Sequence, residues 1–377
     1  MRIAMVVPGG VDRSGRVRVI PVMLAIIERL ARRHQVLVVA LQQQPERCRY
    51  PLLGATVINL GKVEGRGRVF RWISRLWRMI GALRSEGGGF DVIHGFWARG
   101  PGSLAVAAGR VLGVPVVISI GGGELVWLPE IGYGGQGSWV GRAEAFLTLR
   151  MAKAVSAGSR YARGPCIDRR RDTLWLPLGV DVATFDAPVE RSPGPPWRLL
   201  QVASLNLVKD QATLLQAMRL VLKANVKVRL DCIGVDTLGY RLQRTAADLG
   251  IAGSVRFLGF MPLDAVAPFY RQAHLFLQSS LHEAMGAAVL EAAAAGVPTV
   301  GTAVGLVAEM APEAALAVPV RNPAALAEGI LTLLANEQRR RCLGRAAQQF
   351  ARTYDADWTA AQFEAVYTKL RKGSRTS

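Results

Sequence analysis

The chain alternates short apolar segments with amphipathic segments, and it does so in two series. The apolar segments have the length and residue types of buried strands, while the segments between them carry the period of a helix. Strands that alternate with helices form parallel sheets covered on both faces. The segments expected as strands are 2–9, 35–41, 55–60, 91–96 and 114–120 in the first series, and 198–205, 227–234, 254–259, 273–280 and 297–302 in the second.

A proline-rich segment separates the two series. Residues 186–197 read DAPVERSPGPPW and contain four prolines, which is typical of a linker. The 377 residues of the chain are also too many for one core. We therefore predict an α/β protein with two doubly wound, Rossmann-like domains, at 1–185 and 195–350, that face a central cleft. Ligands of such sheets bind beyond the carboxyl ends of the strands.

Charge and cysteine content restrict the partners. The formal net charge of +19 favours an anionic partner. No zinc-finger, RNP-like or helix-turn-helix signature accompanies the charge, so we expect no nucleic acid. The four cysteines are scattered without a CxxC or Cys/His cluster, which predicts neither disulfides nor a zinc site and favours the cytosol. Asp355 and Asp357 form an Asp-x-Asp pattern, which can hold a metal. The stronger interpretation is that these acidic residues suit the N-terminus of a helix expected at about 357–371.

Two glutamates flank an alanine-rich stretch that is expected to form a helix over 284–295. Gly296 stands where a left-handed helix cap belongs. Glu283 and Glu291 are eight residues apart, about 12 Å along a helix, so they cannot attack one centre but could hold two ends of an elongated ligand. The first backbone N–H groups of that helix, at Ala284, Met285 and Gly286, favour an anion such as a diphosphate. A nucleotide sugar has this layout, with hydroxyl groups on either side of a diphosphate.

The same stretch carries a family resemblance. Residues 279–309, SSLHEAMGAAVLEAAAAGVPTVGTAVGLVAE, resemble the donor-site signature of the retaining GT-B glycosyltransferases of family GT4. Further segments resemble that family in the same order along the chain: MRIAMVVPGG (1–10), DVIHGFWA (91–98), LPLGVDVATF (176–185), VASLNLVKD (202–210) and WTAAQFEAVYTKL (358–370). The last of these resembles the family's closing helix, which implies that residues 355–372 cross back to the first domain.

The resemblance implies a role for each matching residue. Glu283 would contact the donor sugar near the reacting carbon, Glu291 would hold the ribose, and Lys209 would neutralise the diphosphate leaving group. Gly9 and Gly10 would bring the backbone of the first domain to the phosphates. The resemblance also implies retention at the anomeric carbon and neither a metal nor another cofactor.

Three positions depart from the family's pattern. Ser204 stands where the family often has arginine, but it stays among the expected donor-site residues. Gly121 stands near the place of a common histidine, and residues 283–286 read Glu-Ala-Met-Gly instead of Glu-Gly-Phe-Gly. His94 lies near the end of the predicted strand 91–96, on the side of the expected cleft, where it would contact acceptor or donor, or else be a structural histidine.

Residues 66–84, RGRVFRWISRLWRMIGALR, predict a basic amphipathic helix. Arg68, Arg71, Arg75 and Arg78 share one face, and the opposite face carries Val69, Phe70, Trp72, Ile73, Leu76, Trp77, Ile80 and Leu83. Such a helix could lie on an anionic membrane, where Trp72 and Trp77 would join the arginines in the contact, or pack its apolar face on the first sheet.

The expected function is that of a hexosyltransferase. It would move a sugar from a UDP-, GDP- or ADP-sugar, with retention, to an unknown acceptor such as a lipid-linked or polysaccharide precursor. The protein would be cytoplasmic, with a peripheral position at the inner face of the membrane as the further expectation. The alternative is a non-catalytic membrane- or polyanion-binding protein on a GT-B scaffold.

Overall fold

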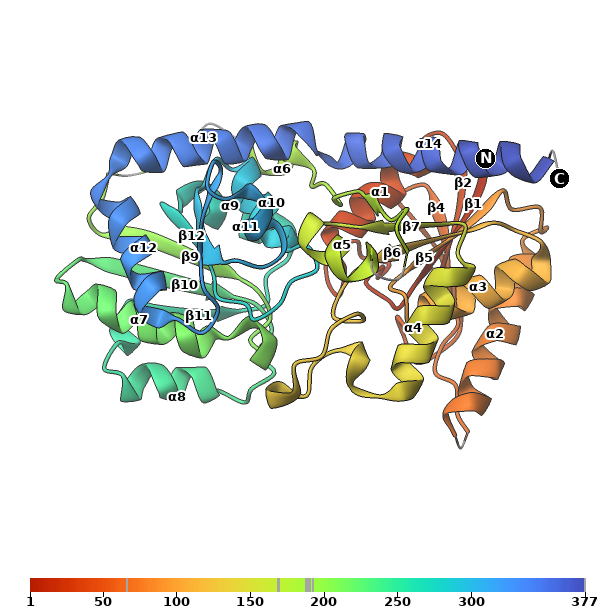
Figure 1. Ribbon diagram of the computed structural model, residues 1–377, viewed down its shortest axis with the longest axis horizontal. Helices are drawn as coiled ribbons and strands as arrows, with labels where there is room; N and C mark the ends of the chain where they lie inside the picture. The colour runs from red at the N-terminus through yellow and green to blue at the C-terminus, as the bar shows by residue number, and fades with distance from the viewer. Residues whose placement is uncertain (66, 168–169, 187–190, 192, 376–377) are drawn as a thin grey trace. The chain divides into compact units, whose positions relative to one another are not determined.

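The computed structural model describes residues 1–65, 67–167, 170–186, 191 and 193–375 (Figure 1). The chain divides into two compact units, one formed by Met1–Leu178 with Ala356–Ser377 and the other by Gly179–Asp355. Each unit contains one sheet with helices on both faces.

The first unit contains an eight-stranded sheet in the order β3-β4-β2-β1-β5-β6-β7-β8. Its strands are parallel except for the edge strand β3, which pairs antiparallel with β4. The strands are β1 (Arg2–Val7), β2 (Gln35–Ala40), β3 (Cys48–Leu52), β4 (Ala55–Asn59), β5 (Val92–Phe96), β6 (Val116–Ile120), β7 (Ala154–Ala157) and β8 (Leu174–Trp175).

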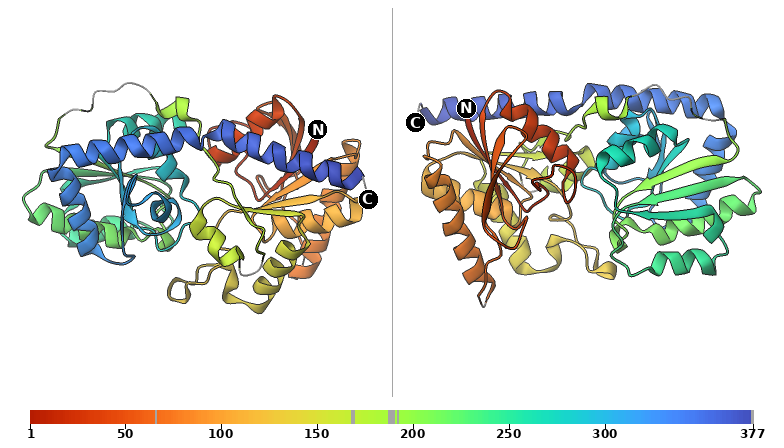
Figure 2. Two further views of the ribbon diagram at one scale, coloured as in Figure 1. Left: turned by 45° about the horizontal axis from the view of Figure 1, so that its top comes forward. Right: turned by 180° about the vertical axis from the view of Figure 1, so that it is seen from behind.

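Two groups of helices cover this sheet. On one face, α1 packs beside α14, and both contribute to the core that also contains residues of β1, β2 and β4 (Figure 2). On the other face, α3 packs on β5, and both α2 and α4 contact α3. The helices of this unit are α1 (Pro21–Ala31), α2 (Arg68–Ser85), α3 (Pro101–Leu112), α4 (Trp139–Met151), α5 (Arg160–Ile167) and α14 (Ala356–Arg375).

The second unit contains a six-stranded, wholly parallel sheet in the order β11-β10-β9-β12-β13-β14. Its strands are β9 (Trp197–Val202), β10 (Val228–Ile233), β11 (Val255–Gly259), β12 (Leu275–Gln278), β13 (Thr299–Thr302) and β14 (Ala315–Val318). Its helices are α6 (Val182–Phe185), α7 (Gln211–Lys223), α8 (Arg241–Asp248), α9 (Leu263–Gln272), α10 (Ala287–Ala294), α11 (Gly305–Met310), α12 (Pro323–Ala335) and α13 (Glu337–Thr353).

The predicted fold class is confirmed, because each unit is a Rossmann-like α/β layer structure with a parallel sheet. The boundary between the units differs from the expected one. The segment 179–185 belongs to the second unit, since Phe185 is buried there and its ring lies edge-on to that of Tyr270, with centroids 5.5 Å apart. Within the expected linker, residues 187–190 and 192 lie outside the described part of the chain, as does residue 66 of the basic stretch.

Four strands were not predicted: β3, β7, β8 and β14. Strands β7, β8 and β14 are short, and β3, β8 and β14 lie at sheet edges, so their sequences carry weaker apolar patterns than the central strands. Across the described residues, no helix is both long enough and apolar enough to span a membrane.

Candidate functional site

An ion pair joins two loops at the carboxyl ends of neighbouring strands in the second unit. Lys209 ends a single 3₁₀ turn (Leu207–Lys209) that follows β9, and Glu283 lies in the loop after β12. The Nζ atom of Lys209 donates to Oε1 of Glu283 at 2.5 Å. The side chain of Lys209 is 24% exposed and that of Glu283 is 12% exposed, so both are mostly buried but remain accessible. The structure therefore brings together the two residues predicted to be catalytic.

Hydrogen bonds hold the two loops against each other. The Ser279 hydroxyl donates to the Lys209 carbonyl at 2.8 Å, and the Leu281 N–H donates to the Val208 carbonyl at 2.8 Å. The Ser280 hydroxyl donates to Oε1 of Glu283 at 2.7 Å, so this oxygen accepts from both serine and lysine. The Glu283 carboxylate is thus fixed by two donors from the protein itself.

The loop after β13 completes this edge of the sheet. Gly305 begins α11 with φ +56°, and a Cβ atom there would lie 2.4 Å from the Met285 carbonyl oxygen and 2.7 Å from Cβ of Glu283. The Leu306 N–H donates to the same Met285 carbonyl at 2.8 Å. Only glycine allows this approach, so Gly305 helps to set the position of the Glu283 loop. The sequence analysis did not single it out.

The helix between the two glutamates begins later than predicted. The α10 helix starts at Ala287, and its N-cap Gly286 has φ +94°, which ends the preceding loop. Ala284 and Met285 therefore belong to the loop, and the prediction that their N–H groups and that of Gly286 open the helix is wrong. The N–H groups at the start of the helix are therefore those that follow Gly286. Ser204 is exposed after β9, and its carbonyl accepts from Gln211 Nε2 at 3.1 Å.

Glu291 is buried within α10, with 6% exposure. The Tyr270 hydroxyl donates to its Oε2 atom at 2.6 Å. Burial raises the pKa of Glu291, while the hydrogen bond from Tyr270 acts in the opposite direction. The tyrosine occupies one carboxylate oxygen, which leaves the other as the acceptor that the predicted ribose contact needs.

The structure adds one polar side chain that the sequence analysis missed. Gln278 ends β12 and is buried, and its Oε1 atom lies 3.2 Å from the position that a Cβ of Gly286 would take. Its Nε2 atom has no hydrogen-bond partner among the described residues. An unsatisfied buried donor is costly, so this amide is available to a ligand atom or water at the same edge. A glutamine in an apolar strand was the only sequence signal.

In the first unit, Gly9 and Gly10 follow β1 as predicted. Gly10 has φ +80°, and a Cβ atom there would lie 2.5 Å from Cγ1 of Ile20. The glycines therefore allow a tight turn at the carboxyl end of the strand. Their contact with phosphates stays a prediction.

His94 lies in β5 and is fully buried, with 0% exposure. Its Nδ1 and Nε2 atoms lie 2.6 Å from the Tyr367 hydroxyl and 2.7 Å from the Ser119 hydroxyl. Burial lowers the pKa of His94 to about 3, so the ring is neutral at physiological pH. Of the two interpretations left open by the sequence, this favours the structural histidine, which ties α14 to the sheet.

The departure at Gly121 has a steric explanation. A Cβ atom at Gly121 would lie 2.7 Å from the Trp97 ring, so Trp97 fills the space that a side chain at 121 would need. Glu124, in the same loop, accepts from the N–H groups of Gly121, Gly122 and Ala98 at 2.7–3.2 Å. Burial raises the pKa of Glu124, and these N–H donors act against the rise. Trp97 and Glu124 therefore shape this edge of the first sheet.

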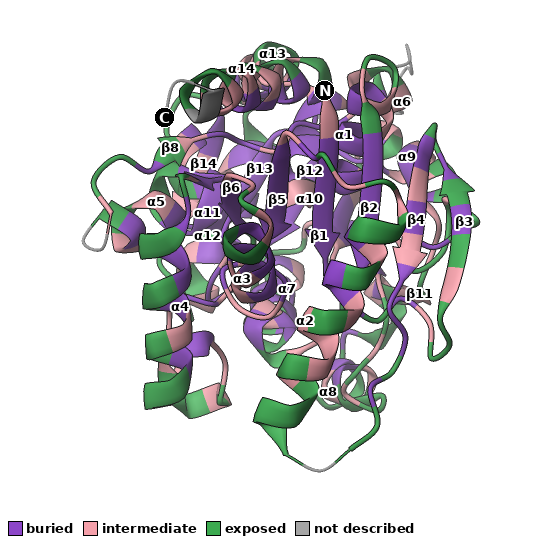
Figure 3. Ribbon diagram, turned by 90° about the vertical axis from the view of Figure 1, so that its right-hand side faces the viewer, coloured by how far each residue is buried: buried purple, intermediate pink, exposed green. Residues whose placement is uncertain are grey.

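The arginines on the basic face of α2 fall into two groups along the helix. Arg75 donates to Gln42, and Arg78 donates to the carbonyls of Leu60 and Lys62, so these two arginines serve the fold. The Trp72 indole also faces inward, donating to Ser103 at 3.1 Å. Arg68 and Arg71 are exposed, together with the apolar side chains Val69, Phe70, Ile73 and Trp77 (Figure 3).

Neither acidic residue of the Asp-x-Asp pattern belongs to a metal-binding group. Asp357 pairs with Arg29 at 3.0 Å. Within the described ranges, no cluster of three or more His, Cys, Asp or Glu side chains could hold a metal ion.

Comparison with known proteins identifies the family. A model of the glycosyl transferase 4-like domain matches residues 19–173, within the first unit, and a model of glycosyl transferases group 1 matches residues 183–350, within the second. The chain belongs to the GT4-type glycosyltransferases. Each unit of this GT4-type chain thus matches one of the two domain models.

Individual relatives match part of the GT4-type chain. A D-inositol 3-phosphate glycosyltransferase of Corynebacterium urealyticum is 31% identical over 210 residues, which cover 54% of this chain and 46% of that protein. A GDP-mannose-dependent alpha-(1-6)-phosphatidylinositol dimannoside mannosyltransferase of Mycobacterium tuberculosis is 31% identical over 189 residues, or 48% of this chain and 49% of that protein. The match therefore spans about half the length of these relatives.

Solved structures share the GT-B fold over nearly the whole chain. Sucrose-phosphate synthase from Thermosynechococcus elongatus gives a TM-score of 0.77 at 17% identity, covering 99% of this chain and 100% of that one. Anabaena HepE, in complex with UDP and glucose, gives a TM-score of 0.75 at 16% identity, and the match covers 97% of this chain and 99% of that one. At these identities the likeness establishes the fold alone.

Proposed function

We propose that this chain transfers a sugar from a nucleotide diphosphate-sugar to an acceptor, with retention of the anomeric configuration. The observation that carries the proposal is the ion pair between Lys209 and Glu283 at the carboxyl ends of β9 and β12. Ligands of open parallel sheets bind at this edge. Family membership makes this edge the expected donor site.

Lys209 would act on the leaving group. When the bond between the sugar and the diphosphate breaks, negative charge develops on the diphosphate, and a positioned cation stabilises that charge. Glu283 holds the Lys209 ammonium group in place. A bound diphosphate would share this ammonium, while Glu283 contacts the sugar. Ser280, which also donates to Glu283, would keep the carboxylate oriented.

Glu291 would select the nucleoside part of the donor. Its buried carboxylate is oriented by Tyr270, and its second oxygen would accept a hydrogen bond from a ribose hydroxyl. The nucleotide would be UDP, GDP or ADP. The mycobacterial relative is named as GDP-mannose-dependent, and the Anabaena structure contains UDP, so both bases occur among similar proteins.

The acceptor side would include an anionic membrane surface. Val69 is 72% exposed and Trp77 is 60% exposed on α2, next to Arg68 and Arg71. On α4, which also contacts α3, Trp139 is 79% exposed and Leu147 is 53% exposed. Exposed aromatic and aliphatic side chains beside arginine suit the interface of an anionic bilayer. A lipid-linked acceptor would be presented at such a surface.

A transfer assay tests the proposal. Release of nucleoside diphosphate is measured from UDP-, GDP-, ADP- and TDP-sugars with a panel of polyol phosphate and lipid-linked acceptors, and NMR of the product gives its anomeric configuration. Lys209→Gln should lower turnover by about 10² or more, the range expected when one charge-stabilising donor is removed. Lys223→Gln, at the exposed end of α7, is the matched control. No release from any donor, or equal rates in both variants, would contradict the proposal.

A further inference from the structure

A cavity lies in the second unit, at the other ends of the strands from Lys209 and Glu283. It has a volume of about 790 Å³. Trp197 begins β9, His274 precedes β12 and Pro298 precedes β13, and all three line the cavity. The cavity therefore lies at the amino ends of the strands whose carboxyl ends form the candidate donor site. We call it the arginine pocket.

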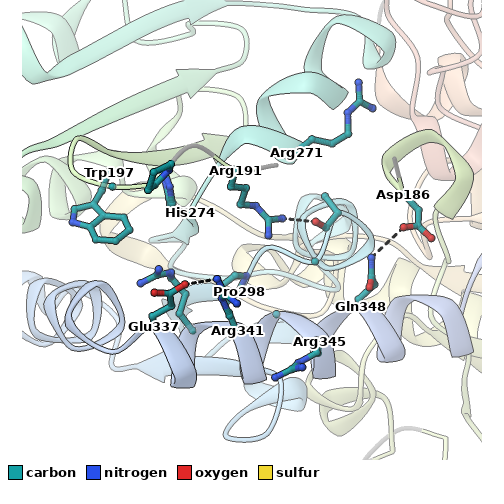
Figure 4. A pocket seen from close by; sticks show the side chains of 16 residues that line it. Asp186, Arg191, Trp197, Arg271, His274, Pro298, Glu337, Arg341, Arg345 and Gln348 are labelled. Carbon is teal, nitrogen blue, oxygen red and sulfur yellow. Dashed lines mark hydrogen bonds and ion pairs between the residues drawn. The ribbon is translucent and has the colours of Figure 1, made fainter. Parts of the chain in front are cut away.

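One face of α13 forms a wall of the arginine pocket (Figure 4). The residues of this face follow helical spacing: Glu337, Arg340, Arg341, Gly344, Arg345 and Gln348. A Cβ atom on Gly344 would lie 2.6 Å from the Gly296 carbonyl oxygen, so the helix approaches the end of α10 closely at this point. The face that lines the cavity is thus polar and basic, although a helix of this kind ordinarily turns apolar residues inward.

Positive charge predominates in the lining. Five arginines line the pocket with only two carboxylates, Asp186 and Glu337. Both carboxylates are already paired, Asp186 with Arg352 at 2.6 Å and Glu337 with Arg341 at 2.5 Å. Among the described residues, no carboxylate forms an ion pair with the remaining four lining arginines, which are Arg191, Arg271, Arg340 and Arg345.

Two of these arginines are partly buried close to each other. Burial and the nearby charge of Arg340 lower the pKa of Arg191, and burial lowers the pKa of Arg340. Arg191 donates to the Ala295 carbonyl at 2.5 Å, but its buried Nε–H has no partner within the described residues. Arg340 caps the end of α12 through the Leu333 carbonyl at 3.1 Å, and its guanidinium lies 4.6 Å from the centre of the Trp197 ring. Clustered, partly desolvated cations need a compensating anion.

We propose that the arginine pocket binds a small anion of the phosphate-ester or polyphosphate class, separately from the donor site. Guanidinium groups match the geometry and charge of phosphoryl oxygens. The volume of the pocket suits a phosphorylated molecule of nucleotide or sugar-phosphate size. Since the lining includes α13 and the end of α10, which is the helix that carries Glu291, an anion there would stabilise the unit that holds the donor.

Calorimetric titration of the full chain with inorganic pyrophosphate at low salt tests this proposal. The double variant Arg340→Gln/Arg345→Gln should weaken pyrophosphate binding by about ten-fold or more, because two charge-assisted contacts are lost. Arg339→Gln/Arg219→Gln is the matched control, since it also removes two charges from this unit, both exposed, but none from the lining. The control should bind as the wild type does.

Two further variants separate the pocket from the donor site and from loss of folding. Lys209→Gln should leave the pyrophosphate binding that depends on Arg340 and Arg345 unchanged. Arg345→Glu alters an exposed side chain whose only described contact is with the Cys342 sulfur, so it should fold normally and still weaken binding. The proposal would be overturned if pyrophosphate binding disappeared with Lys209→Gln but survived both Arg345→Glu and the double variant. Equal loss in the Arg339/Arg219 control would also overturn it.

Discussion

The Nζ atom of Lys209 lies 2.5 Å from Oε1 of Glu283, and this contact connects the loop after β9 with the loop after β12. The two residues are 74 positions apart in sequence but adjacent at one sheet edge. Since Ser280 donates to the same oxygen, Glu283 accepts from two donors within the protein. The pair therefore places a cation and a carboxylate side by side at the carboxyl ends of β9 and β12.

The first prediction concerns this pair. Glu283→Gln should lower kcat by about ten-fold or more with a smaller change in donor affinity, because it would remove the carboxylate that we propose contacts the reacting sugar. Steady-state kinetics and donor titration measure the two effects separately. Combined with Lys209→Gln, the loss should be clearly less than additive, since the side chains act together. Fully additive losses would mean that the two residues act independently.

A second prediction concerns Gly305. Gly305→Ala should destabilise the second unit by about 2 kcal/mol or more, because φ is positive and the new Cβ would meet the Met285 carbonyl oxygen at 2.4 Å. Displacement of the Glu283 loop should also lower turnover. Urea unfolding and kinetics provide the two measurements. Gly253→Ala, where a Cβ would meet no atom within 4 Å, is the control and should be nearly neutral.

The third prediction follows from the burial of His94. Its pKa falls to about 3 in the folded chain, against about 6.5 when unfolded, so acid protonates the unfolded chain first. The stability of the first unit should therefore decrease as the pH falls below about 6.5, by up to about 1.4 kcal/mol per pH unit from this group.

His94→Gln removes that proton uptake. Urea unfolding at pH 7 and pH 5 measures the effect, and hydrogen exchange in β5 identifies the transition of the first unit. Between these pH values the free energy of unfolding should fall by about 2 kcal/mol less in the variant than in the wild type. An identical pH dependence in both proteins would mean that His94 is not neutral and buried in solution.

A fourth prediction concerns the exposed end of α2. Replacing Phe70, Ile73 and Trp77 by serine should weaken binding to phosphatidylglycerol vesicles by about ten-fold or more, because apolar area that enters the interface is lost. Arg68→Gln/Arg71→Gln should weaken binding mainly at low salt. Vesicle co-sedimentation measures both. Serine replacements at Leu220, Val235 and Val320, which are exposed in the second unit, are the control and should change nothing.

Much of the architecture could be predicted from sequence because buried parallel strands and amphipathic helices leave periodic patterns. The helix near Glu283 was placed three residues too early, because Ala284 and Met285 are good helix formers and only the positive φ of Gly286 delays its start. The first domain was expected to extend to residue 185, whereas residues 179–185 lie in the second unit. Phe185 packs there on Tyr270, which is a tertiary contact. Long-range contacts of this kind leave no local signal.

The candidate site was likewise predicted only in part from the sequence. Lys209, Glu283 and Glu291 were predicted from their motif, whereas Gln278 and Gly305 gain their roles only when β12 and β13 lie side by side. The arginine pocket could not be predicted, since it combines residue 191, residue 271 and one face of α13.

The most direct measurement of the central claim is donor binding as a function of pH. Calorimetry with UDP-, GDP- and ADP-sugars is carried out on the wild type, on Glu291→Ala and on Glu313→Ala, an exposed control in the same unit. We expect one class of donor to bind, Glu313→Ala to bind equally well, and Glu291→Ala to bind about ten-fold or more weakly.

Because burial raises the pKa of Glu291, its carboxylate should take up a proton above the usual glutamate range, so donor affinity should fall as the pH is lowered through that raised pKa. Glu291→Ala should lack this part of the pH dependence. Binding of no donor, or equal affinity and pH dependence in the wild type and Glu291→Ala, would contradict the assignment of this sheet edge as the nucleotide-sugar site.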